Sequence, residues 1–444
     1  MALRADVQAW TREIERRYAA RRPRSAELHA RARYALPGGD TRFSSALFPF
    51  STYFESASGQ QLQDVDGHTY VDLTNNNTAL VHGHSHPAIT EAVARQLGRG
   101  TAWVGPNPVQ LELAELLVER VPSLERLRFT NSGSEATAMM VKVARAYTGR
   151  DLIMKMDAFY HGCGDLFEFG PSADDPTRPA PLMAGLPRNL ADNLVIGRFN
   201  DTPGVLELIE RHREALAAVI LTPVSSAGLV EPVPGFLQAV REATARHGIL
   251  LLFDEVITLR LSPGGGQLRY GVTPDMTAVG KIIGGGFPVG GFGGRADIMA
   301  VTDPEGAIRV NHAGTYNGNP ITMTAGRESL RLLTREAFEH LDGLGARLES
   351  GLRAAVTSTR APMHVARVGS LLWLDVAPPA GATEFAEVAP AIRRTLRNAY
   401  LDNGVQALGL NTTTVMTETD VDRGIEGIRL ALDELMSYVG VGVA

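Results

Sequence analysis

The feature that most constrains the fold is a pair of short, continuously apolar runs, AAVILTPV at 217–224 and ILLLFDEV at 249–256. Between them lies FLQAVREATARHG at 236–248, whose apolar residues recur with the 3.6-residue period of a helix. Strands that are apolar on both faces are typical of a parallel sheet covered by helices on two sides. The runs therefore predict an α/β domain built on a parallel sheet.

Helix and strand patterns continue along the rest of the chain. Periodicity predicts helices at 88–97, 109–121, 135–149 and 419–438, a largely helical stretch over the first 35 residues, strands at 124–130, 151–157 and 369–376, and a hairpin at 60–74 that turns at Asp66-Gly67. We expect a large α/β domain over residues 75–320. A smaller α+β domain is expected from both ends of the chain, residues 1–74 and 321–444.

Charge and cysteine usage exclude several classes of function. The net charge of the 444 residues is -6, and basic and acidic residues are interspersed, so no nucleic-acid partner is expected. Apolar runs long enough to span a membrane are absent from the sequence, so no membrane partner is expected either. The single cysteine, Cys163, excludes an internal disulfide framework and favours a reducing compartment, which predicts a cytoplasmic location.

Two segments that follow predicted strands carry groups suited to an anionic or cationic ligand. In FTNSGSEA the small residues Ser132, Gly133 and Ser134 open a helix, where backbone N–H groups bind anions; the same residues also form a good helix cap. In LLLFDEV, Asp254 ends an apolar strand, where a carboxylate needs a partner such as a protonated ring nitrogen. A structural cap or a metal ligand is the alternative for this carboxylate.

Lysine is rare in this chain and occurs only at Lys142, Lys155 and Lys281. Lys281 follows the apolar stretch MTAVG and precedes a run of glycines. Desolvation lowers the pKa of such a lysine and makes it a nucleophile toward aldehydes, while the glycines let a planar cofactor approach the backbone. A surface lysine beside a flexible loop is the alternative.

The fourth segment is AFYHGCGD, where Tyr160 and His161 follow a predicted strand. Tyr160 could stack on an aromatic cofactor or could simply belong to the core. Alone, each of the four segments is a weak signal. In this order and spacing, with GVTPDMTAVGKIIGGGFPVGGFGG and HAGTYNGNP, the chain resembles the class III aminotransferases of the fold-type I pyridoxal-phosphate superfamily from about residue 35 onward.

The resemblance implies a mostly parallel seven-stranded sheet and pyridoxal 5'-phosphate held as a Schiff base on Lys281. It implies that Asp254 holds the ring nitrogen, that Val256 and Tyr160 contact the two ring faces, and that His161 lies close by. It also implies a phosphate site at Ser132, Gly133 and Ser134, completed by Thr315 from the second subunit of a homodimer.

Within the family the chain looks most similar to glutamate-1-semialdehyde aminomutases and β-amino acid transaminases. The candidates for substrate contacts are Arg42 and Arg260 as carboxylate ligands, with Trp103 and Asn77 beside the substrate; a surface arginine is the alternative for Arg42. We expect transfer of an amino group from an amino acid, most suitably a β-amino acid, to an oxo acid.

Intramolecular transfer of the aminomutase type is the main alternative, and racemase, decarboxylase or cofactor binding without turnover are others. Two departures disfavour the aminomutase. The stretch GLNTTTVMT at 409–417 lacks the acidic residue that aminomutases carry there, and Thr222-Pro223 replaces the family's usual Glu-Pro. The histidines of VHGHSHP, His82, His84 and His86, resemble metal ligands, but the family has a similar turn without metal, and no metal is expected.

Overall fold

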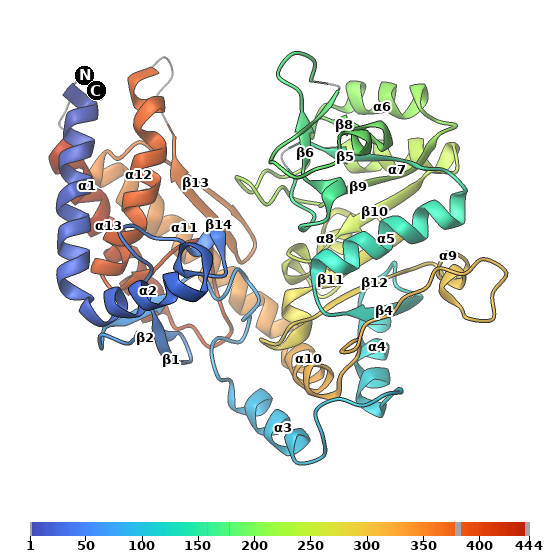
Figure 1. Ribbon diagram of the computed structural model, residues 1–444, viewed down its shortest axis with the longest axis horizontal. Helices are drawn as coiled ribbons and strands as arrows, with labels where there is room; N and C mark the ends of the chain where they lie inside the picture. Colours follow the sequence, from blue (N-terminus) through green and yellow to red (C-terminus); the bar gives the residue numbers. More distant parts are fainter. Residues whose placement is uncertain (1, 158, 177, 378–382, 440–444) are drawn as a thin grey trace. The chain divides into compact units, whose positions relative to one another are not determined.

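The computed structural model describes residues 2–157, 159–176, 178–377 and 383–439 (Figure 1). The chain forms two compact units. Unit 1 comprises the residues up to His86 together with those from Glu339 onward, and unit 2 comprises Pro87–Phe338. The sequence placed the boundaries earlier, at 74 and 320. Residues 75–86 belong to unit 1 because the His84 backbone pairs with Gly59, and the helix after 320 belongs to unit 2 because it packs on two helices there.

Unit 2 is built on a seven-stranded sheet in the order β4-β12-β11-β10-β9-β5-β8. All strands run parallel except β12, which is antiparallel to both of its neighbours. The α/β fold with a mostly parallel seven-stranded sheet is thereby confirmed. The strands are β4 (Arg126–Thr130), β5 (Leu152–Met156), β8 (Leu194–Gly197), β9 (Leu216–Leu221), β10 (Leu250–Asp254), β11 (Met276–Gly280) and β12 (Gly290–Gly294).

Side chains of this sheet alternate between two apolar clusters, one on each face. Leu250 and Leu252 pack in the cluster that contains the buried face of α5, whereas Leu251 and Phe253 pack in the cluster that contains α6 and α7. Both faces are therefore covered, as the continuous apolar runs predict. The helices of unit 2 are α3 (Pro87–Leu97), α4 (Pro108–Arg120), α5 (Gly133–Thr148), α6 (Thr202–Arg211), α7 (Phe236–Arg246), α8 (Gly265–Tyr270), α9 (Ala296–Met299) and α10 (Pro320–Leu332), and a short ladder joins β6 (Phe169–Pro171) to β7 (Pro179–Pro181).

Strand β12 was not expected from the sequence. Its residues, GGFGG, were interpreted as part of a glycine-rich segment that lets a cofactor approach, and glycine disfavours strands. The strand is buried between β4 and β11, and a Cβ atom on Gly290 would lie 2.0 Å from the carbonyl oxygen of Ser132. At this position glycine serves close packing of the backbone against the residues that open α5.

Unit 1 combines helices with two small sheets around one large apolar core. The predicted hairpin at 60–74 is confirmed as β2 and β3, which pair antiparallel across the turn at Gly67. The elements are α1 (Ala2–Arg21), α2 (Pro23–Ala35), β1 (Phe54–Ser58), β2 (Gln61–Asp64), β3 (Thr69–Asp72), α11 (Arg335–Thr359, which begins in unit 2), β13 (Met363–Val368), β14 (Leu371–Val376), α12 (Thr383–Asp402), β15 (Val405–Gln406), β16 (Leu410–Asn411) and α13 (Glu418–Val439).

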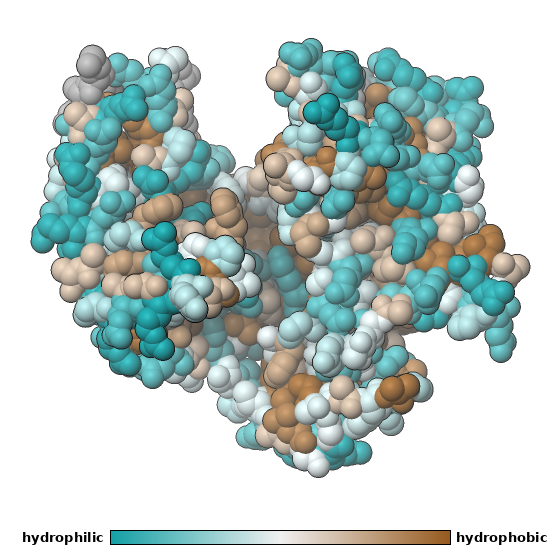
Figure 2. All heavy atoms as spheres, viewed as in Figure 1, coloured by the Kyte–Doolittle hydropathy of each residue, from teal (hydrophilic) through white to brown (hydrophobic). Residues whose placement is uncertain are grey.

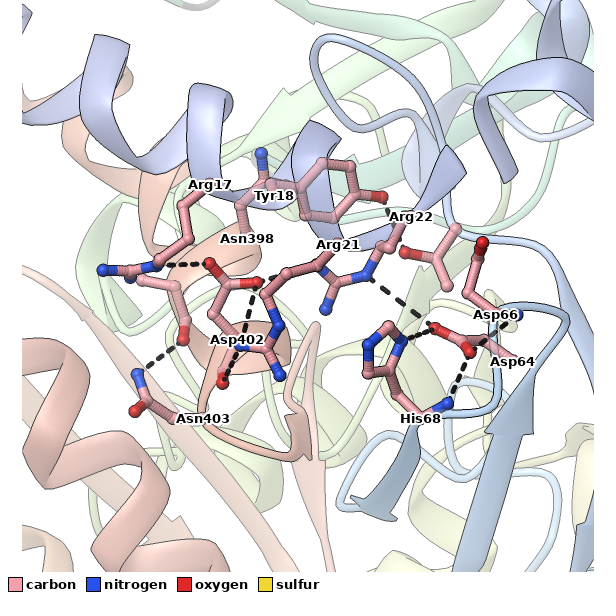
Figure 3. A network of polar contacts seen from close by, with 12 residues as sticks. Arg17, Tyr18, Arg21, Arg22, Asp64, Asp66, His68, Asn398, Asp402 and Asn403 are labelled. Atoms are coloured by element: carbon pink, nitrogen blue, oxygen red, sulfur yellow. Dashed lines mark hydrogen bonds and ion pairs between the residues drawn. The ribbon is translucent and has the colours of Figure 1, made fainter. Parts of the chain in front are cut away.

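A buried polar network fixes α1 to the rest of unit 1 (Figure 3). Nη1 of Arg22 donates to Oδ1 of Asp402 at 2.7 Å, and Nε of Arg17 donates to Oδ2 of the same carboxylate at 2.8 Å. The Arg22 guanidinium also donates to the Tyr70 hydroxyl, which in turn donates to Asp64. Both the Arg22 and the Asp402 side chains are almost fully buried, so these charges depend on each other for compensation.

The face of the molecule in Figure 2 is largely hydrophilic, with some apolar side chains over α3 of unit 2. Leu97, at the end of that helix, is 55% exposed. Among the described residues, no helix combines the length and the apolar character that crossing a membrane requires.

Candidate functional site

The four sequence segments that were singled out meet at one edge of the unit 2 sheet. Ser132 follows β4, His161 lies after β5, Asp254 ends β10, and Lys281 follows β11 directly. These four strands are parallel to one another, so their carboxyl ends lie at the same edge, where open α/β sheets bind ligands. The expectation that the segments form one site agrees with this arrangement.

Lys281 is the lysine that lies at this edge of the sheet. It begins immediately after β11 with a left-handed backbone, φ 51°, a conformation that non-glycine residues rarely adopt and that is enriched at functional sites. Burial lowers the pKa of its amine to about 8, an effect that the charge of Asp254 opposes and that of Arg260 reinforces. More of the amine is therefore neutral and nucleophilic near neutral pH than in an ordinary lysine.

The other two lysines are placed differently. Lys142 lies on the exposed face of α5. Lys155 is buried in β5, and its ammonium donates to the carbonyl oxygens of Phe167 at 2.9 Å and Phe169 at 2.8 Å. Because these backbone bonds occupy its amine, Lys155 serves the packing of the β6 turn.

Asp254 is paired with His161. Nδ1 of His161 lies 2.9 Å from Oδ2 of Asp254, and Oδ1 accepts the backbone N–H of Val256 at 3.1 Å. The imidazole is 1% exposed and lies edge-on between the rings of Phe159 and Phe167. This histidine holds the Asp254 carboxylate in one orientation. Its own Nε2 is buried and has no hydrogen-bond partner among the described residues.

The first turn of α5 offers unpaired N–H donors. The Ser132 side chain caps the helix by accepting the N–H of Glu135 at 3.1 Å. The backbone N–H groups of Gly133 and Ser134 have no acceptor among the described residues, as expected for the first residues of a helix. Two free donors at the positive end of a helix dipole form a site for an anion such as phosphate.

Val256 and Tyr160 lie near this helix start. A Cβ on Gly133 would lie 2.9 Å from the Val256 side chain, and one on Gly280 would lie 3.2 Å from it. Val256 therefore fills the space between α5 and the residue that precedes Lys281. Tyr160 is 65% exposed, and burial of its remaining surface raises the pKa of its hydroxyl. Its ring is accessible to a ligand.

The remaining unit 2 candidates lie in three different environments. Arg260 is 1% exposed, and burial lowers its pKa to about 9; its charge acts on Lys281. Trp103 is half exposed beside Gly100. Thr315 is exposed in a turn that also contains Asn317. Nδ2 of Asn131, which precedes the capping residue of α5, donates to Oδ1 of Asn317 at 2.8 Å and so helps to hold this turn.

Arg42 and Asn77 belong to unit 1, where both line a cavity of about 450 Å³. Among the members of this lining that sequence reasoning missed are Arg397 on α12 and Asn76. Nothing in the helical pattern around Arg397 distinguishes it from a surface arginine. The apolar residues of the lining are Leu47, Phe54, Leu62, Leu80, Ala407 and Leu408.

Two histidines of VHGHSHP have separate hydrogen-bond partners in unit 1. His82 contacts the Thr414 hydroxyl at 2.8 Å, and Nε2 of His84 contacts Asp72 at 2.8 Å. A group of three or more metal-ligating side chains is not found in the part of the chain that the structure describes.

The residues of the unit 2 edge suit one chemical class of cofactor. A neutral lysine reacts with an aldehyde, a buried carboxylate stabilises a protonated ring nitrogen, and free helix N–H groups hold a phosphate. An aromatic aldehyde phosphate carries all three complementary groups, so the site fits pyridoxal phosphate.

Comparison with known proteins agrees with this fit. The family model for class-III aminotransferases matches residues 45–432. A glutamate-1-semialdehyde 2,1-aminomutase from Desulforudis audaxviator is 40% identical over 417 residues, which cover 91% of this chain and 96% of the relative.

Solved transaminases share the fold over nearly the whole chain. An omega-transaminase from Sphaerobacter thermophilus is 42% identical with a TM-score of 0.87, covering 93% of this chain and 97% of its own. A β-phenylalanine aminotransferase from Variovorax paradoxus is 34% identical with a TM-score of 0.85, covering 95% and 96%. The chain belongs to the class III aminotransferases, enzymes that use pyridoxal phosphate.

Proposed function

We propose that this chain is a transaminase that moves the amino group of a β-amino acid to an oxo acid, with Lys281 as the catalytic residue. The observation that carries the proposal is a lysine of lowered pKa beside a histidine-oriented carboxylate, Asp254, at the open edge of the sheet. When bound, pyridoxal phosphate supplies an electron sink for the carbon that bears the substrate amine.

The chain's own residues supply the remaining requirements. Nζ of Lys281 attaches the cofactor and, once displaced by the substrate amine, accepts the proton from the amine-bearing carbon. Asp254 keeps a proton on the ring nitrogen, and His161 keeps Asp254 in place. Ser132, Gly133 and Ser134 hold the phosphate, and Val256 and Tyr160 contact the two faces of the ring.

The assembly and location are part of the proposal. Thr315, on its exposed turn, would reach the phosphate of a second copy, which makes the active form a homodimer. The one cysteine of the chain, Cys163, is unpaired and favours the reducing cytoplasm.

The unit 1 cavity supports the choice of substrate class. Two arginines, Arg42 and Arg397, line a cavity whose other walls combine an apolar part, which includes Phe54, with polar side chains. An arginine binds a carboxylate bidentately, and apolar walls favour an aryl or alkyl substituent. A β-amino acid with an apolar substituent carries both features, and Asn77, Trp103 and Arg260 are the further substrate contacts that we propose.

Intramolecular transfer remains the second candidate because a 40% identical relative is a glutamate-1-semialdehyde aminomutase. Thr222 stands where the family usually has glutamate, and its hydroxyl donates to the carbonyl oxygen of Val224. The segment 409–417, which has no acidic residue, contributes Asn411, and its side chain is bound to backbone carbonyls of unit 1. Neither position therefore supplies the acidic group of the aminomutase pattern.

The test is a titration of the purified holoenzyme with single amino compounds. The visible absorbance of the lysine-bound cofactor is recorded while β-phenylalanine, β-alanine, several α-amino acids, simple amines or 4,5-diaminovalerate are added. We expect a β-amino acid to abolish the band and an oxo acid to restore it. Lys281→Ala is the control and should lack the lysine-bound band from the start.

A spectral change with 4,5-diaminovalerate alone would establish the aminomutase instead. A wild-type protein that never shows the band after addition of the cofactor would overturn the role of Lys281.

A further inference from the structure

Residues Asn75–Thr78 form an unusual left-handed turn at the rim of the unit 1 cavity. Four consecutive residues, none of them glycine, have positive φ angles of 46°, 48°, 53° and 74°. Asparagine tolerates this region better than most residues, but a run of four is strained and persists only where the surroundings enforce it. Such strain often marks a position whose side chains have a task.

Hydrogen bonds to buried polar groups hold the turn in place. The Asp72 carboxylate accepts the N–H groups of Thr74 at 2.8 Å and Asn75 at 3.0 Å. The Asn75 side chain, in a residue that is 0% exposed, donates to Asn411 at 3.2 Å and accepts from Gln60 at 3.1 Å. Asn75 is thus the anchor, and the turn carries the next two residues to the surface of the cavity.

The turn brings Asn76 and Asn77 into the lining of the same cavity as Arg42. Oδ1 of Asn76 accepts a hydrogen bond from Nη1 of Arg42 at 2.8 Å. Among the described residues, the Arg42 side chain makes this one hydrogen bond, which leaves its Nε and Nη2 free. A guanidinium has five N–H donors in a planar fork, so one complete edge stays available for a carboxylate.

The nearest acid does not compete for this guanidinium. Oδ1 of Asp40 accepts the backbone N–H groups of Thr41 and Arg42, at 2.6 and 3.1 Å, and Oδ2 accepts the Ser45 hydroxyl at 2.7 Å. The carboxylate therefore shapes the loop. Burial raises the pKa of Asp40, but these hydrogen bonds together hold it below its usual value. Arg42 is oriented by a neutral amide and forms no direct hydrogen bond from its guanidinium to Asp40, although the two charges attract each other.

We propose that Asn76 is a positioning residue that orients Arg42 toward the substrate carboxylate, and that the strained asparagine turn is therefore a determinant of specificity for carboxylate-bearing amines. The inference rests on the substrate class of the proposed function. Arginine has a long side chain with many rotamers, and fixing it before the substrate arrives removes part of the entropy cost of binding.

The experiment measures binding of unreactive ligands to the holoenzyme by calorimetry. 3-Phenylpropanoate carries a carboxylate and an aryl group but no amine, and 3-phenylpropanol is the same molecule without the charge. Asn76→Gly removes the acceptor and keeps the left-handed backbone that glycine tolerates. We expect about 3- to 10-fold weaker binding of 3-phenylpropanoate, the range expected from one disordered side chain, and unchanged binding of the alcohol.

Two further variants sharpen the test. Asn76→Asp keeps an acceptor but neutralises Arg42, so 3-phenylpropanoate should bind more weakly still, with the loss reduced by salt. Asn200→Gly is the matched control, because Asn200 also has a positive φ, of 68°, but belongs to unit 2 and does not line the cavity, and it should bind like the wild type.

The two possible failures are distinguishable. If Arg42→Ala weakens the binding of 3-phenylpropanoate but Asn76→Gly binds it as tightly as the wild type, or more tightly, the role of Asn76 alone is overturned. A wild-type enzyme that binds the acid no better than the alcohol would overturn the carboxylate substrate class and, with it, the role of Asn76.

Discussion

The two units each bury a polar network, and the two networks differ in how completely they are paired. In unit 1, Arg22 and Asp402 are bound to each other at 2.7 Å, and Tyr70 occupies another side of the guanidinium (Figure 3). In unit 2, His161 and Asp254 are also bound, but Nε2 of His161 and the amine of Lys281 have no hydrogen-bond partner among the described residues.

The pKa values show the consequence. Burial alone would lower the pKa of Arg22, but Tyr70 and Asp402 together raise it above its usual value. Burial of Lys281 is only partly compensated by Asp254, and its pKa falls to about 8. In a fully paired network the charges fix the geometry and leave no reactive group. An incompletely paired network keeps a group that can react. The comparison separates the groups that hold this protein together from those for which we propose a chemical role.

Replacement of Asp254 by asparagine should have the largest effect of the predicted changes, and it should lower the catalytic rate without lowering stability. An amide cannot stabilise a protonated ring nitrogen, so we expect kcat to fall about 10²- to 10³-fold, as when a charge-stabilising group is lost. The amide oxygen still accepts the N–H of Val256, so the melting temperature should stay within about 2 °C of the wild type. Stopped-flow rates with the best amino donor and a thermal scan measure the two effects. A large fall in melting temperature with kcat retained would place Asp254 in the structural class.

Asp402→Ala should show the opposite behaviour. It leaves the buried Arg22 with only the more distant Asp64, at 3.8 Å, as a carboxylate partner, so the loss should approach the value of about 3–5 kcal/mol seen when a buried pair is broken from one side. Amide hydrogen exchange along α1 should become about a hundredfold faster or more, while kcat per folded molecule is unchanged. Glu434→Ala is the control: it removes the more exposed partner of Arg17 and should cost about 1 kcal/mol or less. Equal effects of the two variants would contradict the importance of burial.

The sequence predicts the parts of this molecule that depend on local pattern. The continuous apolar run in ILLLFDEV and the similar run before it suffice to predict the sheet, and each strand end then places its polar residue at one edge. Lys281 directly follows a buried strand, as the sequence predicts, and its pKa is lowered; its catalytic role stays a prediction. In these regions local propensity and tertiary structure agree.

The features that the sequence did not reveal arise from tertiary contacts. Strand β12 is nearly all glycine and forms because two neighbouring strands enclose it, against its own propensity. Arg397 joins the cavity of Arg42 from a helix far along the chain, and no local pattern reports that approach. The left-handed turn around Asn76 is fixed by buried partners such as Asn411, which also lie far away in sequence.

The pH dependence of cofactor attachment sharpens the contrast further. Only the neutral amine of Lys281 attacks an aldehyde, so the rate at which the apoenzyme takes up pyridoxal phosphate should rise with pH up to about 8 and level off above it. Since Asp254 raises this pKa, Asp254→Asn should move the midpoint to lower pH. The absorbance change after rapid mixing gives the rate at each pH. A midpoint near 10, the ordinary value for lysine, would show that burial does not perturb Lys281.

Lys155→Met should have the smallest effect and tests whether a paired network can lie beside the site without taking part in it. Burial lowers the pKa of Lys155 to about 8, as for Lys281, but two backbone carbonyls accept its hydrogen bonds. Methionine fills a similar volume and leaves the carbonyls of Phe167 and Phe169 without that donor, at a cost of about 1–3 kcal/mol. Hydrogen exchange across the β6 turn should accelerate, with kcat within about threefold of the wild type. A hundredfold fall in kcat without faster hydrogen exchange would mean that Lys155 acts on the cofactor site through Phe167 and His161. Full hydrogen bonding would then not suffice to mark a buried group of unit 2 as structural.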